Sequence, residues 1–303
     1  MKMKFALCFS ALISLNIAPC QAQDMEPRRW SHLPIGTHFL GGGVVRTDAD
    51  IVLDPVILAE DVEMEMDTTL LKYIYSFELF NKSALVSIAQ AHHNATWSGL
   101  LAGIPTSIQR VGLSDTAVRF AIYLKGAPPL SGKDYLSYRS NQDIETLVGL
   151  GVVLDLPTGE YMDDKLINLG ANRVRARIQL GAVHKRHNLS FEATGGVWLH
   201  ADNDDFFNGN RLEQDPLYVF QTHVIGQLRR GWVGVSAGAA YGGKTTIASV
   251  EKDDVKKDLF WAVSYGLPLA KRLNVKIAYI GRRTETSTGI DSDSLAVAFS
   301  TFW

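Results

Sequence analysis

The sequence predicts an all-β protein, a closed antiparallel up-and-down β-barrel of about twelve strands that spans the outer membrane of a Gram-negative bacterium. Three observations lead to this prediction: an N-terminal export signal, a recurrent alternation of apolar and polar residues, and a regular sorting of short turns and long loops. Each observation is weak alone, but a soluble β-sandwich has no reason to combine all three.

Residues 1–22 have the features of a secretory signal peptide. Two lysines precede the apolar run Phe5–Ile17, and Cys20-Gln21-Ala22 supplies a small-x-small cleavage site. An uncleaved membrane helix is the first alternative, but the run is too short to cross a bilayer comfortably. Lipoprotein processing at Cys20 is the second alternative, and it is disfavoured by Pro19 immediately before the cysteine. We therefore expect an exported chain.

The composition fits a mildly acidic exported protein. The formal charge of the 303 residues is −2, and removal of the two signal lysines lowers it by two to −4, so we expect no nucleic-acid partner. Both cysteines, Cys8 and Cys20, lie in the signal, which leaves the mature chain without disulfides or thiolate chemistry. We expect no cofactor and no metal ion. The predicted organisation is a signal peptide at 1–22, a short N-terminal segment at 23–36 and the barrel at 37–303.

Alternation with a period of two recurs along the mature chain, as it does in Leu71, Tyr73, Tyr75 and Phe77. No run of about eighteen apolar residues follows the signal, which excludes a helical span. About twelve segments alternate over roughly nine to thirteen residues, the length that a tilted transmembrane strand needs. They are predicted to start near Thr37, Thr69, Ser83, Ser114, Glu145, Ala171, Asn188, Pro216, Trp232, Lys257, Arg272 and Asp293.

The connections alternate between tight turns and long polar loops, as in barrels with periplasmic turns and extracellular loops. Tight turns are predicted at 81–82, 185–187, 229–231 and 270–271, and long loops at 48–68, 98–113, 157–170, 201–215, 244–256 and 284–292. Segment 126–144 breaks the rule, because it is long and lies on the turn side. Its stretch "LSGKDYLSYRSNQ" predicts a helix with Ser131 as N-cap, placed either in the periplasm or in the lumen.

The final residues "DSLAVAFSTFW" predict the closing strand. Leu295, Val297, Phe299 and Trp303 share one face, and small residues occupy the other. Because lipid satisfies no backbone hydrogen bond, this strand must pair with the first. Trp303 then belongs to the periplasmic aromatic girdle. The expected partners are outer-membrane lipid and lipopolysaccharide, and the outer-membrane assembly machinery, which reads such C-terminal strands.

Several segments resemble one family of outer-membrane proteins, labelled meta-pathway phenol-degradation proteins or simply "transporter". They are "LPIGTHFLGGG", "GLSD" with "VRFAIYLKGAP", "PTGEYMDDKLINLGANR" and "GGVWLHADNDDFFNGNRLEQDP", in the expected order over nearly the whole mature chain. The resemblance implies a barrel that passes small, often hydrophobic or aromatic compounds. No catalytic residues are agreed for this family, so none is carried over.

Cationic side chains fall on the inward phase of several predicted strands, because charges facing lipid near the midplane cost about 2–4 kcal/mol. They suggest a basic stripe that favours anionic or polar-aromatic solutes. The alternative, which we favour on general grounds, is that they brace a narrow polar interior by pairing with acids. The candidate lumen residues are Arg119, Arg173, Arg175, Arg177, Lys276 and Arg282.

The segment His200–Asn210 combines acids with two aromatic residues. Oxygen ligands can hold Ca²⁺, but two phenylalanines occupy positions where ligands would be needed, which favours a solvated extracellular loop. Exposed phenylalanines at the mouth could contact lipid or a hydrophobic solute. The mouth candidates are Asp202, Asp204, Phe206 and Phe207.

The predicted function is passive passage, by uptake or efflux, of small hydrophobic or aromatic solutes through a narrow pore, without catalysis. An outer-membrane enzyme acting on lipid is one alternative, suggested by His92-His93 with Ser87 nearby. Adjacent residues of a strand face opposite sides, so only one of the two histidines could join a given site, and no G-x-S-x-G elbow at a strand-to-helix turn is visible. Both observations argue against an enzyme. A structural or adhesive barrel without conductance is the other alternative.

Overall fold

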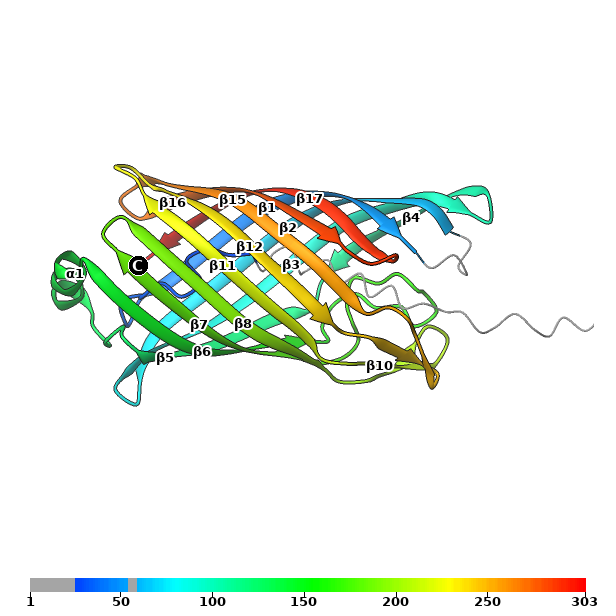
Figure 1. Cartoon of the computed structure of the whole chain (residues 1–303), viewed down its shortest axis with the longest axis horizontal. Coiled ribbons are helices and arrows are strands. Elements are labelled where there is room, and N and C mark those ends of the chain that lie inside the picture. The colour runs from blue at the N-terminus through cyan, green and yellow to red at the C-terminus, as the bar shows by residue number, and fades with distance from the viewer. Residues whose placement is uncertain (1–24, 54–58) are drawn as a thin grey trace, which may run out of the picture.

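Twelve antiparallel strands close into a barrel in the computed structural model, which describes residues 25–53 and 59–303 (Figure 1). This confirms the predicted fold class, whereas the predicted signal peptide lies outside the described residues. Within the described ranges, no helix is long and apolar enough to cross a membrane. The barrel strands are β1 (His38–Val52), β2 (Ala59–Leu79), β3 (Lys82–Leu101), β5 (Thr116–Lys125), β6 (Ile144–Leu156), β7 (Arg175–Arg186), β8 (Leu189–His200), β11 (Leu217–Gln227), β12 (Trp232–Gly242), β15 (Lys256–Ala270), β16 (Leu273–Thr284) and β17 (Gly289–Phe302).

The barrel closes where β1 pairs with β17, as the C-terminal pattern predicted. The register runs from Phe39 opposite Phe302 to Val52 opposite Gly289. Beyond the last strand pair, the amides of His38 and Trp303 each donate to the other residue's carbonyl at 3.1 Å. The ladder therefore continues to Trp303, and this seam closes the twelve described barrel strands into a ring.

The two faces of each strand separate lipid from lumen. On β17, Ser294 is 2% exposed and faces inward, whereas its neighbour Leu295 is 54% exposed on the outer surface. The outer surface of the other strands is similarly apolar, which lipid requires. Exposed residues of this kind include Val44, Leu71, Ile88, Phe120, Ile178, Leu180, Phe220, Val235, Val263 and Ile277.

Aromatic rings cluster on the outside at the end that holds the C-terminus. The His38 ring stacks on Trp303 with ring centroids 5.6 Å apart and on Tyr75 at 4.8 Å. The His38 Nδ1 atom lies 2.6 Å from the hydroxyl of Tyr73. Such amphipathic rings suit the boundary between lipid and water.

The short connections lie at this same end of the barrel. Turns occupy 80–81, 187–188, 228–231 and 271–272, close to the predicted positions. In the first, Phe80 and Asn81 both have positive φ, at 52° and 57°, as a two-residue type I′ hairpin requires. Helix α1 (Gly132–Asn141) begins after Ser131, as predicted, and lies at the barrel end rather than among the strands (Figure 1).

At the opposite end the predicted loops are more ordered than expected. Segment 98–113 is a hairpin, because β3 continues to Leu101 and pairs with β4 (Ile104–Leu113). β1 and β2 likewise extend into the predicted loop 48–68, where Arg46 pairs with Asp48, Glu65 and Asp67. Polar side chains above the membrane gave these strand ends the appearance of loops. Segment 284–292 is mostly strand, and β7 begins at Arg175 rather than near Ala171.

The extracellular connections also build a small second sheet. It contains β9 (Asn203–Phe206), β10 (Asn210–Gln214), β13 (Thr245–Ile247) and β14 (Val250–Glu251), in the order β14-β13-β10-β9. Phe206, Leu212 and Ile247 form its core, and Leu166 and Phe207 pack against them. The segment predicted as a solvated loop at 200–210 is exposed along most of its length, but it is an ordered hairpin rather than an irregular loop, because Phe206 belongs to the core of this sheet and Phe207 packs against it.

Deletion of Phe302 and Trp303 should sharply reduce the amount of assembled barrel while leaving export intact. It removes the last rungs of the β1–β17 seam and exposes the backbone of His38 and Phe39. The amount of heat-modifiable protein in membrane fractions measures this. Trp303→Phe, which keeps the backbone pair and an aromatic ring, is the control. Equal yields of the truncated and complete chains would contradict the prediction.

Candidate functional site

Residues 25–36, here called the lumen segment, lie inside the barrel. Trp30 is 1% exposed, and its indole N–H donates to Thr194 Oγ1 at 2.9 Å. The ring fits against inward glycines of two adjacent strands: a Cβ added to Gly149 or Gly181 would lie 2.6 or 2.0 Å from it. These glycines therefore form a slot that the Trp30 ring fills.

Polar contacts fix the lumen segment along its length. Lys72 Nζ lies 2.9 Å from Glu26 Oε2, and the amide of Arg28 donates to Glu192 Oε2 at 2.8 Å. Toward the periplasmic end, the Tyr123 hydroxyl donates to the carbonyl of Ser31 at 2.6 Å. The Tyr135 hydroxyl, from helix α1, donates to His32. The segment thus lies within the periplasmic half of the lumen, where it lines one side of a cavity of about 1080 Å³.

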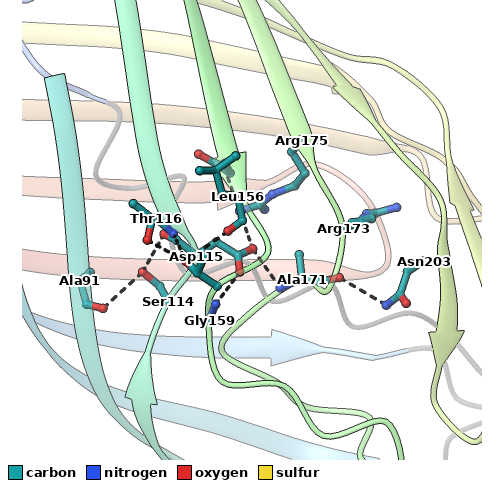
Figure 2. A network of polar contacts seen from close by, with 12 residues as sticks. Ala91, Ser114, Asp115, Thr116, Leu156, Gly159, Ala171, Arg173, Arg175 and Asn203 are labelled. Carbon is teal, nitrogen blue, oxygen red and sulfur yellow. Dashed lines mark hydrogen bonds and ion pairs between the residues drawn. The ribbon is translucent and has the colours of Figure 1, made fainter. Parts of the chain in front are cut away.

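A second segment, residues 157–174 between β6 and β7, is held in place by Asp115 and is here called the inward loop. The Asp115 carboxylate accepts from the amides of Gly159 at 3.1 Å and Ala171 at 3.0 Å, so one side chain fixes both arms of the loop (Figure 2). The arms touch, since a Cβ on Gly159 would lie 2.8 Å from the Cα of Gly170.

The inward loop reaches the wall formed by β1, β2 and β3. Leu169 is buried there against Met64, Met66 and Trp97, together with Ala49, Ile51 and Ala95. This apolar contact explains why a loop with several charges turns inward rather than into water. The lumen is therefore narrowed from the extracellular side as well.

A cavity of about 170 Å³, here called the chamber, lies deeper in the lumen between these elements. Both the lumen segment, through Glu26 and Arg29, and the barrel wall contribute to it. Five cationic side chains face two carboxylates, and the lining also includes an indole, several aliphatic groups, His200 and Ser87. The cations are Arg29, Lys72, Arg119, Arg175 and Lys276, the acids are Glu26 and Asp155, and the larger apolar residues are Leu70, Val153 and Trp198.

The six predicted lumen residues divide into two groups. Arg119, Arg175 and Lys276 line the chamber. The other three are buried among partners: Arg173 donates to the Ala201 carbonyl and to Gln214, Arg177 lies over the Trp198 ring at 5.0 Å, and Arg282 pairs with Asp258 at 2.7 Å. Arg175 combines both roles, because it also pairs with Asp155 at 2.9 Å.

Sequence reasoning missed the contribution of the lumen segment, including Glu26 and Arg29, and did not select Lys72 or Trp198 as site residues. One signal was present. Gly149, Gly151 and Gly181 fall on inward phases of neighbouring strands, which indicates that something bulky approaches the wall there.

The mouth candidates differ from the prediction. Asp202 and Asp204 both pair with Arg211 at the surface. Phe206 is 4% exposed in the core of the small sheet, so the expectation of an exposed ring was wrong for it, whereas Phe207 is half-buried. In the parts of the chain that the structure describes, no three His, Cys, Asp or Glu side chains gather as a metal site would require.

The two adjacent histidines face opposite sides, as strand geometry demands. His92 is exposed outside, and His93 is buried in the lumen with Nδ1 2.8 Å from Thr68 Oγ1. Its hydroxyl partner is thus a threonine on β2. The absence of catalysis remains a prediction.

Gly181→Ala should displace Trp30 and loosen the lumen segment, because the added methyl group would overlap the indole. Single-channel conductance in planar bilayers should rise. Gly195→Ala on the neighbouring strand is the matched control, since a Cβ there meets nothing within 4 Å. Wild-type conductance in a well-assembled Gly181→Ala variant would contradict the proposed role of the slot.

Asp115→Ala should release the inward loop, because both amides lose their acceptor. Lys165 lies in a tight turn, in which its amide donates a hydrogen bond to the Met162 carbonyl and its carbonyl accepts one from the Asn168 side chain. Trypsin should therefore cleave after Lys165 faster once the loop is released. Mass spectrometry of the assembled barrel during limited digestion measures cleavage after Lys165. Asp204→Ala, at an exposed carboxylate, should leave that rate unchanged, and an unchanged rate in Asp115→Ala would refute the anchoring role.

Comparison with known proteins supports the fold and identifies the family. The chain is similar to the COG4313 outer membrane channel from Pseudomonas putida F1, with a TM-score of 0.75, 18% identity, and coverage of 92% of this chain and 99% of that one. It is also similar to the TodX monoaromatic hydrocarbon channel deltaS2 mutant, with a TM-score of 0.51, 11% identity and 91% coverage of each chain. No curated protein sequence matches. The profile of one family matches residues 42–268, and the chain belongs to that family, which is described as "Putative MetA-pathway of phenol degradation".

Proposed function

We propose that the protein is a passive outer-membrane channel for small aromatic compounds, and that its chamber favours aromatic anions. The observation that carries this proposal is the chamber lining, in which five cations and the Trp198 indole surround about 170 Å³ of space. An apolar cavity of about 150 Å³ holds benzene, so a single substituted ring is of suitable size.

The chamber suits a ring that carries a negative group. Lys276 and Arg119 approach from β16 and β5, so an anion there meets positive charge from opposite walls. Trp198, with Leu70 and Val153, offers apolar surface for the ring. Several sites that attract a solute without trapping it are what conduction requires.

The names of the similar proteins agree with this solute class. The family description refers to phenol degradation, and the TodX structure is titled a monoaromatic hydrocarbon channel. Phenolic compounds and aromatic acids share one ring size and differ mainly in charge. The charge of the chamber therefore decides which of them passes faster.

Lys276→Gln should slow an aromatic carboxylate such as benzoate by about tenfold at low salt, the lower end of electrostatic effects on association. Benzyl alcohol, which is neutral and of similar size, should pass at nearly the wild-type rate. Added salt should narrow the difference, because it screens the charge. Uptake into liposomes that contain the assembled barrel measures both rates.

Lys271→Gln is the matched control, since Lys271 is exposed in the turn of the same β15–β16 hairpin. Equal slowing of both solutes would show that Lys276 only braces the wall. A wild-type barrel that passes neither solute would favour the structural or adhesive alternative, and release of fatty acids from the liposomes would favour the enzyme.

A further inference from the structure

His32, in the lumen segment, lies against Glu145, an inward residue near the periplasmic start of β6. The His32 side chain is fully buried and that of Glu145 is 4% exposed, with His32 Nδ1 3.7 Å from Glu145 Oε1. Helix α1 packs over this pair, since the rings of Tyr135 and Tyr138 lie edge-on to the imidazole at centroid distances of 5.0 and 5.5 Å. The pair therefore connects the lumen segment to the barrel wall at the periplasmic end.

The other polar atoms of the two side chains have partners that fix where the imidazole proton lies. His32 Nε2 is 2.9 Å from the carbonyl oxygen of Pro128, which can only accept, so Nε2 carries a hydrogen. In the neutral ring Nδ1 is then an acceptor. Arg139 of α1 donates to Glu145 Oε2, the carboxylate oxygen that does not face the imidazole.

With a neutral imidazole, two acceptors face each other and no proton lies between them. Among the described residues, neither Nδ1 of His32 nor Oε1 of Glu145 has a hydrogen-bond partner, and both atoms are closed to water. Buried acceptors without a donor are costly, and proteins normally satisfy such groups. One proton on Nδ1 turns the contact into a charge-assisted hydrogen bond and satisfies both atoms at once.

The other titratable groups around His32 come from each element packed against it. The nearest like charge is Arg139, which opposes protonation of the ring, but it is itself paired with Glu145. The Tyr135 hydroxyl donates to the His32 carbonyl at 2.8 Å, and the phenol of Tyr138 lies near Glu145. The remaining groups have partners of their own: Tyr123 donates to the Ser31 carbonyl, Lys185 donates to the Gln142 carbonyl, and Glu192 accepts from the Arg28 amide.

We propose that His32 and Glu145 form a proton-operated latch that holds the lumen segment inside the barrel. Only the docked segment places the imidazole beside the carboxylate, so the docked state binds the extra proton more tightly than a withdrawn one. By linkage, the latch contributes to docking at acid pH, and this contribution is lost as the pH rises through the range in which histidine titrates. The latch needs no solute, and only its effect on passage rests on the proposed channel function.

Hydrogen exchange of the assembled barrel in lipid nanodiscs tests the latch, with mass spectrometry of peptides that span residues 25–36. Protection is expressed relative to an unstructured peptide of the same sequence at each pH, which removes the pH dependence of the exchange chemistry itself. Protection should fall about tenfold or more between about pH 5 and about pH 8, the effect of losing a hydrogen bond to a charged group. Equal protection at both ends of this range in the wild-type barrel would overturn the proposal.

Two variants separate a titrating latch from a fixed ion pair. His32→Gln removes the titrating group, so protection should no longer depend on pH. In Glu145→Gln the new amide can donate to the neutral Nδ1 while its oxygen still accepts from Arg139, so protection should stay high at about pH 8. A fixed ion pair would instead lose protection at every pH in that variant. His187→Gln, which removes another imidazole from the lining of the same cavity, is the matched control and should keep the wild-type response.

A pH response that persists in His32→Gln, or low protection at every pH in a well-assembled Glu145→Gln barrel, would overturn the latch. Single-channel conductance then connects it to passage. Wild-type conductance should rise with pH over the same range and stay at its acid value in Glu145→Gln. If the channel proposal fails instead, conductance does not follow pH, while the pH response of protection and its dependence on His32 persist.

Discussion

A bilayer core offers no hydrogen-bond partner to a peptide group, and the structure of this protein follows from that constraint. All backbone groups at membrane depth must pair within the sheet, so the sheet must close on itself. Here closure depends on the seam between the first and last barrel strands, which continues to the carbonyl and amide of Trp303. Trp303 is therefore a rung of the seam that closes the barrel, whereas β4, in the extracellular β3–β4 hairpin, pairs with β3 alone among the described strands.

Closure sends every second side chain into a lumen that twelve strands make narrow, and the polar groups there need partners. Much of the interior is accordingly cross-braced, as by Arg282 with Asp258 and Arg175 with Asp155. Bracing and solute selection are not exclusive, however. Arg175 is held by Asp155 and still lines the chamber, so an arginine fixed by the wall also presents positive charge to the lumen.

The strands were predictable because their alternation is dictated by lipid on one side, and the tight turns followed from strand spacing. The inward phase of Arg119, Arg175 and Arg177 followed in the same way. The positions of the inward loop and the lumen segment could not be predicted from the sequence, because contacts between residues far apart in the chain determine them. Asp115 anchors a loop about 50 residues away through two amides, and Trp30 occupies a slot made by Gly149 and Gly181. No periodic pattern encodes such pairings. The strand ends above the membrane were predicted as loops, because a strand surrounded by water needs no apolar face and so shows no alternation of apolar and polar residues.

The lumen segment both obstructs part of the lumen and supplies two residues of the chamber lining. Burial of a large apolar side chain such as Trp30 stabilises by about 1.5–3 kcal/mol, and its withdrawal would also separate Lys72 from Glu26 and leave Glu192 without the Arg28 amide. These contacts together hold the segment against the barrel wall. Glu26 and Arg29 are at once part of the segment and part of the chamber lining. An anion in the chamber therefore meets Lys72 already paired with Glu26, and it meets Arg29 from the same segment. For the channel function proposed above, a solute shifts the position of the segment only by the difference in its affinity for the two positions, and the paired charges of Glu26, Lys72 and Arg29 make that difference depend on the charge of the solute.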